Sequence, residues 1–203
     1  MIVGLQHFIN IYFKSKDLAQ LMLRLDSPET RGMLFWIFNQ DVVAILVCHD
    51  IANGEFVAQI PYFPPVQSVR DYPEERCRQL VNSIFFADQS AGTGHQVDIV
   101  DVGCWSMDAV FASKYTNESG RVFLAGDSAH AYPPSGGFGM NTGVGDAFCL
   151  AHHIARAYRH SAVTNDQARQ AMAQEYELER KWVGMKTRNY ALHNFQLGIG
   201  IAN

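Results

Sequence analysis

The sequence has 203 residues and a formal net charge of -4, and 48% of its residues are hydrophobic. Charged residues make up 18%, below the roughly 25% that is usual for soluble domains. This composition excludes a disordered chain and a basic nucleic-acid-binding surface. The longest apolar run, residues 42–48, is far shorter than the about 20 residues that span a bilayer. We therefore expect a soluble, cytoplasmic protein with no integral membrane segment and no nucleic-acid partner.

The first part of the chain predicts a sheet with a helix inserted in it. Four segments have the apolar and β-branched character of strands: residues 5–13, 33–38, 42–48 and 55–60. Ser15 is a plausible N-cap for a helix whose apolar residues recur from Leu18 to Leu25. Asn39-Gln40-Asp41 predicts a hairpin connection between the second and third strands.

A proline-rich break precedes the next helix and a long extended segment. Residues 61–65 are predicted to interrupt regular structure. Pro73, followed by two glutamates, has the composition of a helix N-terminus. The apolar face of that helix is predicted to consist of Cys77, Leu80, Val81, Ile84 and Phe85. Residues 91–94 predict a second break, and residues 97–115 an extended stretch.

The last part combines one short strand with two helices. Residues 121–125 predict a buried inner strand of a parallel sheet, and a glycine-rich loop follows them. A helix is expected from about Asn141, and its apolar face should carry Val144, Ala147, Phe148, Leu150, Ala151, Ile154, Ala155 and Tyr158. A second helix is expected from near 165 to about 186, and residues 190–195 fit more than one structure. The predicted fold class is α/β, in a mixed α+β arrangement.

The loop after the predicted strand carries the clearest chemical signal. Gly126 and Asp127 end the strand, so one carboxylate is expected at the sheet edge where open α/β folds bind ligands. Two prolines stiffen the loop and three glycines let its backbone approach a ligand: Pro133, Pro134, Gly136, Gly137 and Gly139. The next helix directs its free N–H groups to the same place. These features predict a pocket for a polyhydroxylated ligand with an anionic or polarisable group.

This segment resembles the second FAD-binding motif, the Gly-Asp motif, of the class A flavoprotein monooxygenases related to p-hydroxybenzoate hydroxylase and phenol hydroxylase. The shared features are the Gly-Asp pair, a histidine three residues after Asp127, the double proline, the glycine cluster ending in Gly-x-Asn, and Asp146-Ala147. Residues 176–180 are similar to the Tyr-x-x-Glu-Arg of that family. The resemblance is strong over residues 97–180 and looser before them.

The resemblance implies specific roles for residues of this loop. Asp127 would accept a hydrogen bond from the ribityl chain of FAD. Gly139, Met140 and Asn141 would face the pyrimidine end of the flavin. The implied cofactor-binding set is Gly126, Asp127, Pro134, Gly137, Gly139, Met140 and Asn141. The implied catalytic residues, which would face flavin and substrate, are Pro133 and Pro134.

The resemblance also implies a reaction and a domain organisation. In this family NAD(P)H reduces FAD, and the reduced flavin uses oxygen to hydroxylate an aromatic ring. FAD, NAD(P)H and a small phenolic substrate are therefore expected, and a homo-oligomer is a further expected state. Residues 1–117 would form a mixed-sheet substrate domain, and residues 118–203 the C-terminal strand and helices of a Rossmann-like FAD-binding domain.

The Gly-x-Gly-x-x-Gly motif that holds the FAD pyrophosphate in this family does not occur in the sequence. The expected protein is therefore the C-terminal portion of such a hydroxylase. Two alternatives stay open at this point. One is a truncated, non-catalytic remnant, and the other is a related flavoprotein that hydroxylates a quinone or isoprenoid.

Several single residues allow more than one interpretation. His130 fits a catalytic or a structural role, and the structural role is favoured. Glu179 and Arg180 are expected to form a structural ion pair or an inter-domain contact rather than to take part in catalysis. His152 and His153 diverge by about 100° on a helix, so they cannot share one metal, and both are expected to be partly solvated. Cys149 is interpreted as a packing residue with no metal-ligating neighbours, so no metal site is predicted. The aromatic residues Tyr62, Phe63 and Trp105 fit either a substrate cavity or a core.

Overall fold

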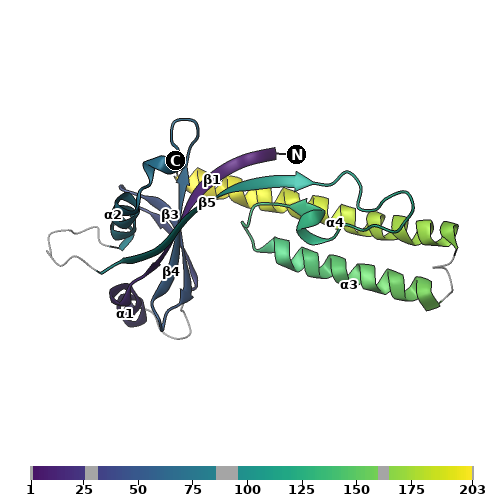
Figure 1. The fold of residues 1–203 in the computed structure, drawn as a ribbon, viewed down its shortest axis with the longest axis horizontal. Coiled ribbons are helices and arrows are strands. Elements are labelled where there is room, and N and C mark those ends of the chain that lie inside the picture. The colour runs from purple at the N-terminus through teal and green to yellow at the C-terminus, as the bar shows by residue number, and fades with distance from the viewer. Residues whose placement is uncertain (1, 26–31, 86–95, 160–164, 203) are drawn as a thin grey trace. The chain divides into compact units, whose positions relative to one another are not determined.

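The computed structural model describes residues 2–25, 32–85, 96–159 and 165–202 (Figure 1). The chain divides into two compact units, one formed by Gln6–Ser106 and the other by Met1–Leu5 with Met107–Asn203. The described ranges contain six strands and four α-helices, which confirms the predicted mixture of α and β structure. None of the described helices is both long enough and apolar enough to cross a membrane. The predicted break at 91–94 lies outside the described residues.

The strands are ordered β2-β3-β4-β1-β5-β6. The first five are β1 (Ile2–Lys14), β2 (Leu34–Phe38), β3 (Val43–Asp50), β4 (Glu55–Tyr62) and β5 (Asp98–Phe111). β2 with β3, β3 with β4, and β4 with β1 pair antiparallel. All the strands predicted before residue 60 are confirmed. β4 continues through Pro61, opposite Phe8 in the ladder, so the predicted interruption begins after Tyr62.

Two helices cover one face of the sheet in the Gln6–Ser106 unit (Figure 1). They are α1 (Lys16–Leu25) and α2 (Glu74–Phe85), and both confirm the sequence predictions. The Ser15 hydroxyl accepts a 3.3 Å hydrogen bond from the Leu18 N–H, which is the expected N-cap. Alternate residues of β1, β3 and β4 face these helices and form a continuous apolar core with them.

The three aromatic residues left open by the sequence have different environments. Tyr62 is buried in the core of its unit, whereas Phe63, next along the chain, is exposed. Trp105 is half-buried, stacks on Phe8 with ring centroids 5.0 Å apart, and donates a 2.9 Å hydrogen bond to Asn10. Tyr62 and Trp105 therefore take part in packing within the Gln6–Ser106 unit.

The second unit is built on two long helices that lie side by side (Figure 1). They are α3 (Phe138–Arg159) and α4 (Asp166–Ala202). The short strand β6 (His130–Ala131) pairs antiparallel with the end of β5. α3 begins three residues before the predicted start at Asn141. α4 continues past Lys186, so residues 190–195 are helical.

Residues 121–125 do not form the predicted inner strand of a parallel sheet. Phe123 makes one isolated bridge, to Thr116, and Val122 is 55% exposed. A buried strand needs hydrogen-bonding neighbours along its length. Among the described residues, only the segment around Tyr115–Asn117 supplies them: Leu124 donates to the Tyr115 carbonyl, and the Val122 carbonyl accepts from Asn117. The strand prediction is therefore wrong in this structure.

Candidate cofactor site

The loop that carries the Gly-Asp pair lies directly on helix α3. Gly126–Ser128 form a single 3-10 turn, η3, in which Gly126 has a φ of 58°. A Cβ built on Gly143 of α3 would lie 3.2 Å from the Gly126 Cα, which is tighter than ordinary contact. Glycine at both positions therefore allows the loop backbone to approach the helix this closely.

The buried carboxylate of Asp146 anchors this loop. Its Oδ2 accepts hydrogen bonds from the Gly126 N–H at 2.9 Å and lies 2.7 Å from Nε2 of His130. Its Oδ1 accepts a 2.7 Å hydrogen bond from Nε of Arg180 on α4. One side chain thus joins α3 to the loop, to β6 and to α4. The structural role expected for His130 is confirmed, and Arg180 forms its ion pair with Asp146.

The charge of Asp146 is set by opposing effects. Burial raises the pKa of this carboxyl, whereas hydrogen bonds from His130, the Gly126 N–H and Arg180 lower it. The net effect is a pKa below the ordinary value, so Asp146 is ionised at neutral pH. The three donors compensate the cost of burying this charge, and the arrangement holds the backbone of Gly126 in place.

Asp127, for which the family resemblance implies a hydrogen bond to the ribityl chain, is exposed. Its neighbour Gly126 is held by Asp146, whereas no hydrogen bond within the described residues engages the Asp127 carboxylate itself. The predicted acceptor thus has a fixed backbone and a free carboxylate. Such a group can accept hydrogen bonds from hydroxyl groups of a ligand.

The two prolines of the loop differ in exposure. Pro133 is fully buried, whereas Pro134 is exposed. The Pro134 carbonyl accepts a 2.9 Å hydrogen bond from the Gly137 N–H. The neighbouring Ser135 carbonyl accepts one from Asn194 of α4 at 3.2 Å. The loop is therefore tied to α4, with Pro134 on its open side.

The start of α3, where Gly137 and Gly139 lie, has open space beside its backbone. Gly137 has a φ of 65°, and a Cβ on Gly137 or on Gly139 would meet nothing within 4 Å. Met140 is 79% exposed, and Asn141 is exposed and donates a 3.1 Å hydrogen bond to the Gly137 carbonyl. The first N–H groups of a helix lack partners within the helix. This helix end therefore offers free donors next to open space.

Helix α3 buries the face opposite to the one predicted from its apolar spacing. Phe148 and Tyr158 are each 77% exposed, and Val144 and Ile154 are exposed as well. The buried residues of α3 are Thr142, Asp146, Cys149, His153 and Ala157. Within the described ranges α4 covers this polar face, because Arg180 pairs with Asp146 there.

Two further residues of α4 hold the segment before the loop, and the sequence assigned no role to either. Tyr176 donates a 2.7 Å hydrogen bond to the Leu124 carbonyl. Glu177 accepts hydrogen bonds from the N–H groups of Tyr115 and Thr116, at 2.8 and 3.1 Å. The Tyr-x-x-Glu-Arg pattern could have identified Tyr176, whereas Glu177 occupies one of its unspecified positions and carried no signal.

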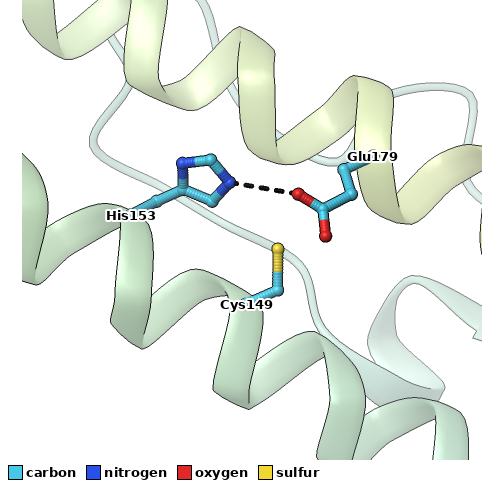
Figure 2. A group of neighbouring side chains, drawn as sticks. All are labelled: Cys149, His153 and Glu179. Atoms are coloured by element: carbon cyan, nitrogen blue, oxygen red, sulfur yellow. Dashed lines mark hydrogen bonds and ion pairs between the residues drawn. The ribbon is translucent and has the colours of Figure 1, made fainter.

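A group of potential metal ligands lies between α3 and α4 (Figure 2). Cys149 and His153 are buried on α3, and Glu179 reaches them from α4, with its Oε2 3.4 Å from Nε2 of His153. Burial and then the Glu179 carboxylate raise the pKa of the Cys149 thiol to about 11. The expectation that Cys149 has no metal-ligating neighbours is wrong. His153 is buried rather than partly solvated, because α4 covers it, whereas His152 is exposed.

The sequence profile of the FAD binding domain family matches residues 3–191. The chain belongs to this family. The predicted resemblance is thereby confirmed, and FAD is the cofactor of the family. The match extends over nearly the whole chain, so it includes both the Gly-Asp loop and the sheet that precedes it.

Relatives of this FAD binding domain chain include named monooxygenases. It is 43% identical over 99 residues to 4-methyl-5-nitrocatechol 5-monooxygenase of Burkholderia sp, and this alignment covers 49% of this chain and 17% of that protein. It is 35% identical over 167 residues to tetracenomycin A2 monooxygenase-dioxygenase of Streptomyces glaucescens, and this alignment covers 82% of this chain and 27% of that protein. The chain spans about a third or less of the length of these curated relatives.

A solved structure has the same fold. It is RebC-10x soaked with chromopyrrolic acid and bound to 7-carboxy-K252c. The similarity has a TM-score of 0.71 at 25% sequence identity, and it covers 95% of this chain and 32% of that chain. The chain therefore has a fold that forms part of a larger known structure.

Proposed function

We propose that this chain supplies the Gly-Asp side of the FAD site, and the substrate side, of a flavoprotein monooxygenase that hydroxylates an aromatic ring. FAD, when bound, supplies the redox chemistry, with NAD(P)H as reductant and oxygen as oxidant. The observation that carries the proposal is an exposed, unengaged Asp127 whose backbone is fixed by buried Asp146. The assignment of residues 1–117 to the substrate domain and of 118–203 to the FAD domain stays a prediction.

The role proposed for Asp127 is to accept hydrogen bonds from the ribityl hydroxyl groups. A carboxylate accepts such bonds more strongly than a neutral oxygen does. The Gly126 N–H, held by Asp146 at 2.9 Å, keeps the adjoining peptide from moving when a ligand binds. The residue is thus ordered in advance, which lowers the entropy lost on binding.

The role proposed for the start of α3 is to face the pyrimidine end of the flavin. Gly137 and Gly139 leave room for close approach of a ring system, and Met140 and Asn141 flank it. The positive end of a helix stabilises negative charge by about 0.3–1 kcal/mol at exposed positions. This donor set fits a cofactor that becomes more negative when it is reduced.

The two prolines are proposed to shape the side where substrate meets the flavin. Exposed Pro134 would contact the ligands, and buried Pro133 would support it from within the loop. Relatives named for a nitrocatechol and for a tetracenomycin favour a phenolic or polyketide-like aromatic substrate. A rigid apolar surface suits such a flat ring, because it loses little entropy on binding it.

The test of the cofactor assignment is retention of FAD. The purified 203-residue protein is mixed with FAD, freed of unbound flavin on a desalting column, and measured by flavin absorbance. Asp127→Ala should weaken retention by about 10-fold or more, since a hydrogen bond to a charged group contributes about 1.5–3 kcal/mol. The matched control is Asp101→Ala, an exposed aspartate of the other unit, which should retain FAD. No retention by the unaltered protein, or equal retention by both variants, would overturn the assignment.

The test of the reaction is separate from that of binding. Flavin-loaded protein should oxidise NADH or NADPH, and a phenolic or polycyclic aromatic compound should gain one hydroxyl oxygen, which mass spectrometry with labelled oxygen detects. Flavin-loaded protein that leaves both nucleotides unoxidised would refute the monooxygenase proposal while leaving the cofactor site intact.

A further inference from the structure

The side chains of Cys149, His153 and Glu179 converge between helices α3 and α4 (Figure 2). Cys149 and His153 are four residues apart, so they project from the same face of α3. Glu179 approaches from α4. One potential ligand atom from each lies within 4.8 Å of the others. We propose that these three residues bind a single Zn²⁺ ion.

The spacing of the three side chains suits a tetrahedral ion. Zinc binds sulfur at about 2.3 Å and nitrogen or oxygen at about 2.0–2.2 Å, so its ligand atoms lie about 3.3–3.8 Å apart. The Nε2 of His153 and Oε2 of Glu179 are already 3.4 Å apart. The two α3 ligands are buried, whereas Glu179 is exposed. Its exposed side chain can therefore rotate to complete the site.

The chemistry of the donors selects the class of metal. A thiol that binds as thiolate, an imidazole and a carboxylate form a mixed sulfur, nitrogen and oxygen set, which suits zinc. Calcium and magnesium prefer sets made only of oxygen ligands. Three protein ligands leave a fourth position, which water can fill from the exposed side of Glu179.

The surroundings of His153 supply the outer partner that metal-bound histidines usually have. Its Nδ1 lies 3.6 Å from Oε2 of Glu175, while Nε2 faces Glu179. When Nε2 binds an ion, Nδ1 carries the proton and faces the Glu175 carboxylate, which can orient the ring. Arg156 pairs with Glu175 and so holds that carboxylate in place. Its Nη2 also lies 3.4 Å from Nδ1, and this contact is given up when Nδ1 carries the proton.

The ion would link the two helices that carry the loop anchor. Asp146, which holds Gly126, is one turn before Cys149 on α3. Its partner Arg180 follows Glu179 directly on α4. The role inferred for the zinc is to stabilise α3 against α4, because its ligands come from both helices. This inference does not depend on the proposed monooxygenase activity.

The test is titration of the full chain with Zn²⁺ after treatment with a chelator and a reductant. We expect one Zn²⁺ per chain, by competition with a chromophoric chelator, together with a raised thermal unfolding midpoint. Substitution with Co²⁺ should give the near-ultraviolet charge-transfer band of a thiolate ligand. Absence of stoichiometric Zn²⁺ binding at micromolar concentration would overturn the proposal.

The variants assign the ligands. Cys149→Ser should abolish the cobalt charge-transfer band, and His153→Gln should weaken Zn²⁺ affinity by more than about 10-fold, since even outer partners of metal ligands contribute 10- to 100-fold. Glu179→Gln, on an exposed residue, should weaken Zn²⁺ affinity in a chain that keeps its fold. The matched controls are Cys104→Ser and His152→Gln, both exposed, and they should bind normally. A band that survives in Cys149→Ser, or disappears in Cys104→Ser, would refute the site.

Discussion

The carboxylate of Asp146 and the imidazole of His130 meet at 2.7 Å, and both side chains are fully buried. The contact joins the middle of α3 to β6, and the same carboxylate holds the Gly126 N–H and Arg180. Exposed residues of the loop, such as Asp127 and Pro134, therefore lie next to a buried polar cluster. The buried Asp146 carboxylate thus holds the backbone next to the exposed Asp127.

Replacing Asp146 by asparagine should destabilise the protein strongly. The change keeps the shape of the side chain but leaves Arg180 without its counter-charge. Removing one partner of a buried ion pair costs about 3 kcal/mol or more. Urea unfolding measures the loss. Asp127→Asn is the control, since this aspartate is exposed and should change stability by less than about 0.5 kcal/mol. Equal stability of Asp146→Asn and the unaltered chain would contradict the anchoring role.

The stability of the protein should fall in acid, in part through Asp146. The pKa of this carboxyl is lower in the folded state than the about 3.9 of an unfolded aspartate. Its contribution is therefore complete above the unfolded pKa, and it is lost as pH falls through the folded pKa, between about pH 5 and pH 2. Unfolding free energies measured across this range should fall less steeply for Asp146→Asn. Parallel curves for the two proteins would argue against the linkage.

Removing the Tyr176 hydroxyl should loosen the segment before the loop. This hydroxyl donates a 2.7 Å hydrogen bond to the Leu124 carbonyl, and burial raises its pKa, so it stays a donor. Tyr176→Phe should lower the free energy of unfolding by about 1 kcal/mol. Tyr158→Phe, on an exposed tyrosine, should have no measurable effect. The prediction fails if the two variants unfold at the same urea concentration.

Replacing Gly184 of α4 by alanine should destabilise the protein, although alanine usually stabilises a helix by about 1 kcal/mol relative to glycine. A Cβ at this position would lie 2.5 Å from the Tyr115 hydroxyl oxygen and 3.2 Å from Cδ2 of His130. Gly184→Ala should therefore destabilise the protein by about 1–3 kcal/mol.

The Tyr115 hydroxyl gives this prediction an internal check. It is buried, and no hydrogen bond engages it within the described residues. Tyr115→Phe alone should thus cost little, because it removes no hydrogen bond. The double variant Tyr115→Phe with Gly184→Ala should recover part of the lost stability in thermal melts. No recovery would mean that another neighbour causes the clash.

Local signals in the sequence predicted the elements that depend on nearby residues. Ser15 caps α1 as expected, and the Pro73 start of α2 is correct to within one residue. Residues 121–125 show where this approach ends. Their apolar character is typical of a buried strand, but a strand exists only if other segments pair with it, and pairing is not local.

The candidate site likewise has a part that could be predicted from local sequence and a part that required the fold. The order of residues from Gly126 to Asn141 was sufficient to predict an FAD motif and its family, because that motif is continuous in the chain. The role of Asp146 required the fold, since its partners lie 16, 20 and 34 positions away in sequence.

By itself, the sequence determined the helices, most strands, the Gly-Asp loop and the family of this protein. Only the tertiary structure decided which face of α3 is covered, and so which of its side chains meet α4. Spacing along a helix defines its faces, but the neighbour that packs against it chooses the buried one. Here α4 covers the polar face, because Arg180 compensates the charge of Asp146. The same packing brings Cys149, His153 and Glu179 together.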